Sequence, residues 1–138
     1  MKREILYTEP VVSEMVDSGE EYLSKFKFPN AEIEVTSLPE GPRHLKYYSY
    51  GPLVVLQILK MIKKAERDNF DGVIIGCFYD PGLREAREIA EQVVVTAPAE
   101  ASMHIASTLG QRFSIIVTEN KTVPLMRENV IKYGFFGS

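Results

Sequence analysis

Three continuous apolar runs constrain most strongly what this 138-residue chain can fold into. The runs are VIIG at 73–76, VVVT at 93–96 and FSIIVT at 113–118. Each is rich in β-branched residues and lacks polar alternation, which is typical of strands covered on both faces by other elements. Segments with helical period lie between them, so the sequence predicts βαβ units on a parallel sheet. We therefore expect an α/β fold with three layers, α/β/α.

The remaining elements follow from the same periodicities. The expected strands cover 5–8, 33–37, 72–76, 93–96 and 113–118, and the expected helices cover 12–26 (with Met15 on its apolar stripe), 52–67, 100–109 and 122–133. A further helix is expected to begin with Asp80 as N-cap and Pro81 in its first turn. The segment 39–51 is rich in Pro, Gly and Tyr and has no clean period, which predicts a long loop over a sheet edge.

Composition excludes several classes of protein. The 16 basic and 19 acidic residues give a net charge of −3 and form no long block of one sign, which argues against a nucleic-acid partner. No apolar run approaches the ~18 residues of a membrane span, so we expect no membrane partner. A single cysteine cannot form an internal disulfide, so a cytoplasmic protein is expected. No spacing of His, Cys or Asp resembles a metal site.

Cys77 follows the expected strand 72–76, at the end of a parallel sheet where ligands usually bind. A helix N-terminus just after it would stabilise negative charge and favour a thiolate, suited to proton abstraction or nucleophilic attack. An unpaired cysteine is also often a small buried hydrophobe, and position alone leaves both interpretations open. The candidate bases for a Cys-His pair are His44, in the long loop, and His104, in a helix.

Two stretches resemble a known family. They are DGVIIGCFYDPGLREAREIA at 71–90 and EASMHIASTLGQRFSIIVTENKTVPLMRENVIKYG at 100–134. Together they resemble the hydantoin racemase branch of the aspartate/glutamate/hydantoin racemase superfamily, over about 52–134. Cys77 followed by Asp80, Pro81 and Gly82 matches the family's first catalytic-cysteine motif. Phe-Tyr after this cysteine, where amino-acid racemases have Asn-Thr, favours the hydantoin branch.

The resemblance implies cofactor-free racemisation by two thiols, which remove and return a proton on opposite faces of a carbon next to a carbonyl. Cys77 would be one of these acid/base groups. Substrate contacts are expected from Phe78, Tyr79, Thr118 and Glu9, with the tyrosines at 47, 48 and 50 forming a wall. We expect a small-molecule substrate, a homo-oligomer, no cofactor and no metal.

The family is built from two similar halves, and its second cysteine belongs to the later half. The sequence is therefore expected to divide into a first α/β domain over 1–110 and the first strand and helix of an incomplete second domain over 111–138. The second thiol would then lie outside these residues, which contain one cysteine.

Departures from the family pattern leave alternatives open. Glu9-Pro10-Val11 stands where the family has Asn-Pro-Asn, and Val117 replaces a threonine, although Thr118 keeps a family hydroxyl position. If Glu9 faces the substrate, its carboxylate would disfavour an anion there. The alternatives are a one-thiol, decarboxylase-like lyase and a truncated ligand-binding module without activity.

Overall fold

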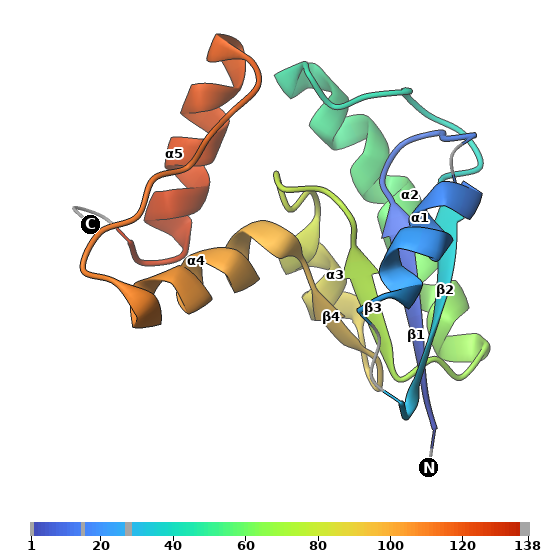
Figure 1. The fold of residues 1–138 in the computed structure, drawn as a ribbon. Coiled ribbons are helices and arrows are strands. Elements are labelled where there is room, and N and C mark those ends of the chain that lie inside the picture. Colours follow the sequence, from blue (N-terminus) through green and yellow to red (C-terminus); the bar gives the residue numbers. More distant parts are fainter. Residues whose placement is uncertain (1, 15, 27–28, 136–138) are drawn as a thin grey trace.

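In the computed structural model, which describes residues 2–14, 16–26 and 29–135, four strands form one parallel sheet in the order β2-β1-β3-β4 (Figure 1). The strands are β1 (Arg3–Glu9), β2 (Ala31–Ser37), β3 (Gly72–Ile75) and β4 (Val94–Thr96). In the register of the sheet, Tyr7 of β1 lies between Val35 of β2 and Ile74 of β3. The parallel α/β architecture predicted from the continuous apolar runs is confirmed.

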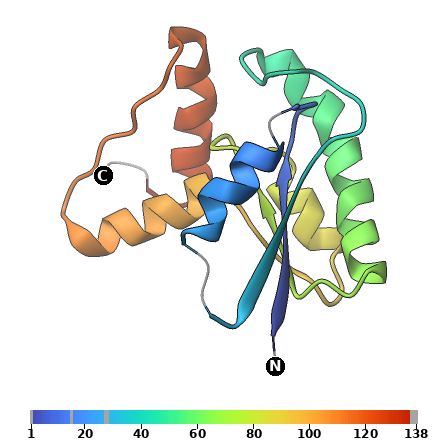
Figure 2. The ribbon, with the colours of Figure 1, turned by 45° about the vertical axis from the view of Figure 1, so that its right-hand side comes forward.

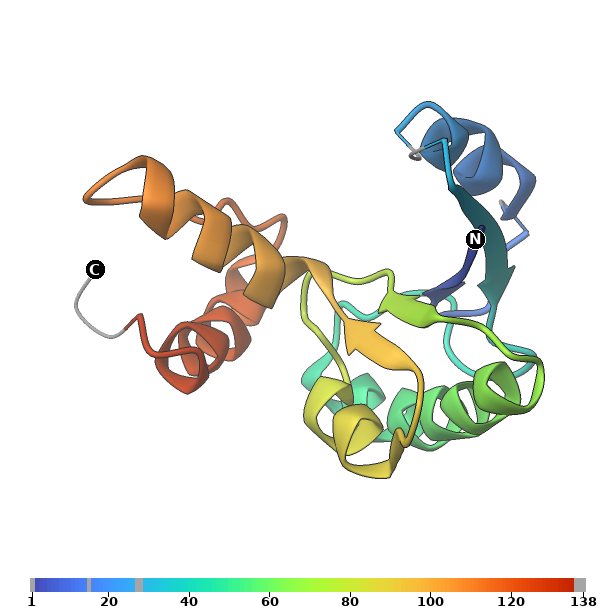
Figure 3. The ribbon, with the colours of Figure 1, turned by 90° about the horizontal axis from the view of Figure 1, so that it is seen from below.

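Within the described residues, five α-helices connect or follow the strands. They are α1 (Val16–Ser24), α2 (Gly51–Arg67), α3 (Leu83–Ile89), α4 (Pro98–Leu109) and α5 (Val123–Lys132), with short 3-10 turns at Tyr48–Tyr50 and Asn120–Thr122. Figure 2 shows that β1, β2 and β3 point to the same end of the sheet, where the loops after them gather. Seen from below, α2 and α3 cover one face and α1 lies on the other, which confirms the three layers (Figure 3). Met15 lies outside the described residues.

The main core lies between the sheet and the apolar stripe of α2. The stripe is made by Val54, Ile58, Ile62 and Ala65, all fully buried, and it packs with sheet residues that include Leu6, Val73, Ile75 and Val95. Pro52 lies in the first turn of α2, where its missing N–H leaves no helical hydrogen bond unmade. Local periodicity was therefore sufficient to predict this helix and the strands beneath it.

A second, smaller core lies away from the sheet, where α4 extends outward and α5 packs beside it (Figure 1). Its buried members are Ala99 and Met103 from α4 and Met126 from α5. These helices lie on either side of the expected boundary at residue 110, and that boundary remains a prediction.

The prediction of a strand at 113–118 is wrong for the described structure. The segment is extended but pairs with no described strand. Its residues alternate instead, with Phe113, Ile115 and Val117 half-buried against α4 and α5 while Ile116 is 94% exposed. An apolar run gives the propensity for a strand, but a strand also needs a neighbour to accept its hydrogen bonds.

The helix expected to begin at Asp80 begins later. Gly82, with φ of 68°, is the N-cap residue of α3, and the first helical residue is Leu83. Asp80 also has a positive φ, of 49°, and its carboxylate turns to the N-terminus of α4, where it accepts hydrogen bonds from the backbone N–H groups of Ala99 and Glu100. Asp80 is therefore a capping residue, but for a helix further along the chain.

Candidate active site

Cys77 lies two residues beyond the end of β3, in a turn that the backbone closes. The N–H of Gly76 donates to the carbonyl of Thr8 at 2.8 Å. This hydrogen bond extends the pairing of β1 with β3 by one residue beyond the end of β3. The N–H of Asp80 then donates to the carbonyl of Cys77 at 3.0 Å. The cysteine is thus held at the carboxyl end of the sheet, where the sequence placed it.

Tyr7 packs directly on the backbone before the cysteine. A Cβ atom at Gly76 would lie 2.3 Å from the Cζ atom of Tyr7, so this contact requires glycine. The Tyr7 hydroxyl also donates to the carbonyl of Gly76 at 3.4 Å. Burial raises the pKa of Tyr7, with smaller contributions from Glu9 and Cys77, which places all three groups in one neighbourhood. Sequence reasoning missed Tyr7, because one tyrosine on a strand carries no distinctive signal.

Burial is the main influence on the protonation of the Cys77 thiol. Its pKa is raised to about 11, mainly by burial; a hydrogen bond from the backbone N–H of Tyr79 to the sulfur opposes this rise, and the negative charge of Asp80 contributes to it. This direction is opposite to the one expected from a helix that follows the cysteine. α3 has seven residues and begins only at Leu83, and the negative charge of the buried Asp80 disfavours a thiolate at Cys77.

Cys77 opens onto a cavity of about 290 Å³. The lining residues are Glu9, Pro10, Val11, Leu45, Lys46, Gly76, Cys77 and Tyr79. Three of the predicted site residues, Glu9, Cys77 and Tyr79, are therefore brought together. Leu45 and Lys46 come from the loop 39–51 and were not among the predicted site residues, which in this loop were the tyrosines.

Other predicted site residues lie elsewhere. Phe78 is 40% exposed and lines a different cavity, together with Met103 and Ile116. Thr118 is exposed in the extended segment before α5 and lines neither of these two cavities. Their assignment as substrate contacts stays a prediction.

The aromatic residues of the 39–51 loop form their own cluster. The ring of His44 lies 5.7 Å from that of Tyr47 and 5.5 Å from that of Tyr50. Tyr47 and Tyr48 line a separate cavity of about 530 Å³, between the start of α2 and α5. His44 does not line the Cys77 cavity, and His104 is exposed on α4 with its ring against Phe135.

Two kinds of feature are absent from the described residues. No group of three or more His, Cys, Asp or Glu side chains there could hold a metal ion. None of the helices in the described part of the chain is long and apolar enough to cross a membrane.

Comparison with known proteins places this site in a family. Residues 12–137 match the family model described as Asp/Glu/Hydantoin racemase. The chain belongs to this family. The Cys77 motif therefore lies within a matched Asp/Glu/Hydantoin racemase domain.

Curated and structural relatives agree with the family assignment. The chain is 32% identical over 105 residues to a hydantoin racemase of Pseudomonas sp. (strain NS671), covering 76% of this chain and 42% of that protein. It is 30% identical over 108 residues to a hydantoin racemase of Rhizobium meliloti, covering 78% and 44%. Allantoin racemase from Klebsiella pneumoniae has a similar structure, with a TM-score of 0.91 at 29% identity, covering 98% of this chain and 55% of that one. The chain thus spans about half the length of these racemases.

The arrangement in the Cys77 cavity can perform two kinds of chemistry. The neutral thiol can donate a proton to carbon, and its thiolate can remove one. The Glu9 carboxylate can accept hydrogen bonds from ring N–H groups of a ligand.

Proposed function

We propose that this chain contributes one acid/base side of a racemase that acts on hydantoins or related cyclic ureides, such as allantoin, without a cofactor. The observation that carries the proposal is the Cys77 thiol facing a cavity that it shares with Glu9, in a chain of the Asp/Glu/Hydantoin racemase family. The names of the similar proteins, hydantoin racemase and allantoin racemase, support this class of substrate.

The proposed reaction inverts the carbon next to the ring carbonyl. One group removes the proton from this carbon, the electron pair delocalises onto the carbonyl oxygen, and a second group returns a proton to the opposite face. A raised pKa favours the protonated form of Cys77. Cys77 is therefore the proposed proton donor when the other group starts the reaction as the base. In the reverse direction the roles exchange.

The second acid/base group is proposed to be a thiol outside these 138 residues. Cys77 is the one cysteine in the sequence, and the chain spans about half of the relatives it matches. The proposed domain division, 1–110 and 111–138, would place this second thiol in the later half of the fold.

Substrate recognition is proposed to favour a neutral ring. The Glu9 carboxylate would accept a hydrogen bond from a ring N–H and would repel an anionic substrate group. The backbone N–H groups of Phe78 and Tyr79 and the hydroxyl of Thr118 remain proposed contacts. A homo-oligomeric assembly and a cytoplasmic location also remain proposals.

The test is the loss of optical activity from enantiopure substrates. A 5-substituted hydantoin and allantoin would each be incubated with the full natural chain and with the Cys77→Ser variant, and corrected for spontaneous racemisation. We expect wild type to abolish the rotation of at least one substrate and Cys77→Ser to slow this by at least 100-fold, the lower range of acid/base catalysis. Ser107→Ala, which removes one exposed oxygen from α4, serves as the control. Equal rates for wild type and Cys77→Ser would overturn the proposal, as would the absence of racemisation of both substrates.

A further inference from the structure

Asn129 is a buried amide in the middle of α5, far along the sequence from the cysteine. It is 4% exposed, although asparagine is a poor helix former and a buried amide must find partners. Its Nδ2 atom donates a hydrogen bond of 2.9 Å to the backbone carbonyl of Tyr79, 50 residues earlier in the chain. The amide thus connects α5 to the turn that carries Cys77.

Tyr79 is the residue whose backbone faces the cysteine sulfur. Its N–H donates to the sulfur of Cys77, and its carbonyl, on the other side of the same Cα atom, accepts from Asn129. The planar peptide that carries this carbonyl also carries the N–H of Asp80, which donates to the carbonyl of Cys77 at 3.0 Å. Asn129 and Cys77 therefore hold this peptide from both ends, and the freedom of Tyr79 to turn its own N–H away from the sulfur is reduced.

A second hydrogen bond from α5 holds the next residue of the turn. The hydroxyl of Tyr133 donates to Oδ2 of Asp80 at 2.8 Å. Tyr133 follows Asn129 by four positions, so both side chains lie on the same side of the helix. Asp80 has a positive φ of 49°, a conformation that a non-glycine residue rarely adopts and that needs support from its surroundings.

We propose that Asn129 is a positioning residue for Cys77, acting through Tyr79 and assisted by the Tyr133–Asp80 hydrogen bond. The inference rests on the proposed acid/base role of Cys77, but it concerns the thiol itself and can be tested without substrate. By keeping the Tyr79 N–H on the sulfur, α5 stabilises the thiolate that must form in every catalytic cycle, against the effect of burial.

The experiment titrates the thiol directly. The full natural chain is labelled with cysteine carrying ¹³C at Cβ, the Cys77 signal is assigned by its loss in Cys77→Ser, and its chemical shift is followed from pH 7 to 11.5. Asn129→Leu removes the donor with little change in size, and Asn120→Leu makes the same change at an exposed position. We expect the rising part of the Asn129→Leu titration curve to lie about one pH unit above that of wild type, which means roughly tenfold less thiolate at pH 10, and the Asn120→Leu curve to coincide with wild type.

A merely structural role would give a different pattern. Asn129→Leu would then lower the unfolding midpoint while its thiol titration coincided with that of wild type, and this result would overturn the proposal. An equal shift in Asn120→Leu would also overturn it. If Asn129→Leu does not fold, the test uses Tyr133→Phe, which removes one hydroxyl from the same side of α5. We expect this variant to shift the thiol titration in the same direction by a smaller amount. A titration unchanged from wild type would refute the proposal. Because no substrate is used, failure of this test leaves the proposed racemase activity untouched, and the reverse also holds.

Discussion

The carboxylate of Asp80 caps α4 by accepting a hydrogen bond of 2.7 Å from the backbone N–H of Glu100, 20 residues further along the chain. Its other oxygen accepts from the N–H of Ala99 at 2.9 Å, and the side chain is 2% exposed. Two unpaired N–H groups of the α4 N-terminus are thereby satisfied by a residue of the Cys77 turn. The same residue therefore connects the cysteine to the second core.

Replacing Asp80 by Asn should destabilise the fold. The amide keeps one acceptor but turns an NH₂ group towards an N–H or hydroxyl donor, so at least one buried group loses its partner. We expect the free energy of unfolding to fall by about 1–3 kcal/mol, measured by urea denaturation. Asp68→Asn, at an exposed carboxylate that pairs with Lys64, should stay within about 0.5 kcal/mol of wild type. Equal losses in the two variants would refute the capping role.

Gly82 offers a test of the turn that leads into α3. Its φ of 68° is unfavourable for any residue with a Cβ atom, although Val55 leaves space at ordinary contact distance of 3.5 Å. Gly82→Ala should therefore cost about 1–2 kcal/mol of unfolding free energy from backbone strain alone. Gly51→Ala is the matched control, because Gly51 has helical φ of −50° and open space around it. This control should be neutral or stabilising by up to about 1 kcal/mol. A Gly82→Ala variant as stable as Gly51→Ala would contradict the left-handed conformation.

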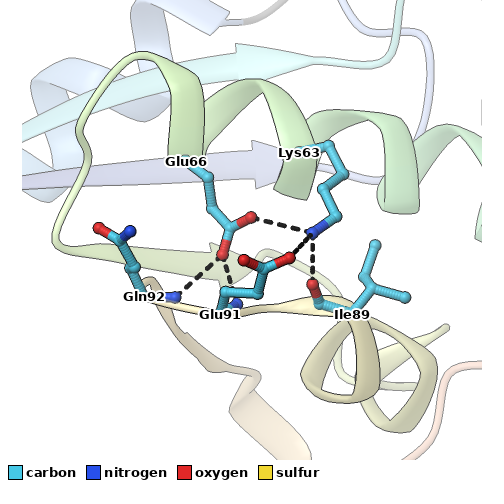
Figure 4. Close-up of polar contacts among 5 residues, drawn as sticks. All are labelled: Lys63, Glu66, Ile89, Glu91 and Gln92. Atoms are coloured by element: carbon cyan, nitrogen blue, oxygen red, sulfur yellow. Dashed lines mark hydrogen bonds and ion pairs between the residues drawn. The ribbon is translucent and has the colours of Figure 1, made fainter.

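Glu66 should make folding stability depend on pH in the acid range. Its carboxylate accepts hydrogen bonds from the backbone N–H groups of Glu91 and Gln92, and it pairs with Lys63 (Figure 4). These hydrogen bonds lower its pKa from 4.5 to about 2. Because the pKa is lowered by folding, the stabilisation is complete above about pH 4.5 and is lost as the pH falls to about 2.

We therefore expect Glu66→Gln to be less stable than wild type at pH 7, with the difference shrinking between pH 4.5 and 2. Urea denaturation at a series of pH values measures this difference. Glu88→Gln, at an exposed position of α3, should follow the wild-type pH dependence. A constant difference between Glu66→Gln and wild type across this range would argue against the lowered pKa.

Glu9→Gln should change which substrates the site accepts. The repulsion between the Glu9 carboxylate and an anionic substrate group at contact distance costs about 1 kcal/mol when partly screened. Removing it should therefore reduce the preference for a neutral over an anionic substrate by about fivefold. The measurement compares kcat/KM for a hydantoin with a carboxymethyl group at C5 and for its neutral amide. Glu85→Gln, which lines the larger cavity away from Cys77, should leave this ratio unchanged. If Glu9→Gln also leaves the ratio unchanged, Glu9 does not face the substrate.

The features predicted correctly from the sequence depend on local pattern. The stripe of α2 and the continuous run of β3 are determined by side chains a few positions apart, and the family motif located Cys77 at the end of that strand. The predicted strand at 113–118 failed because pairing depends on a neighbour that periodicity does not report. Two contacts were not predicted because their partners lie far apart in the sequence. Asp80 caps a helix residue 20 positions later, and Asn129 donates to a carbonyl 50 positions earlier. The raised pKa of Cys77 depends on burial, which its apparent helix-start position does not reveal.

The central claim is that Cys77 moves the proton on one face of the substrate carbon, and deuterium exchange tests it most directly. A single enantiomer of a 5-substituted hydantoin is incubated in D₂O with the full natural chain, and both enantiomers are separated and analysed for deuterium at C5 at early times. The account predicts one deuterium in the product enantiomer, little in the recovered substrate, and loss of this incorporation in Cys77→Ser. Deuterium entering the recovered substrate with retained configuration, or incorporation at an unchanged rate in Cys77→Ser, would contradict it.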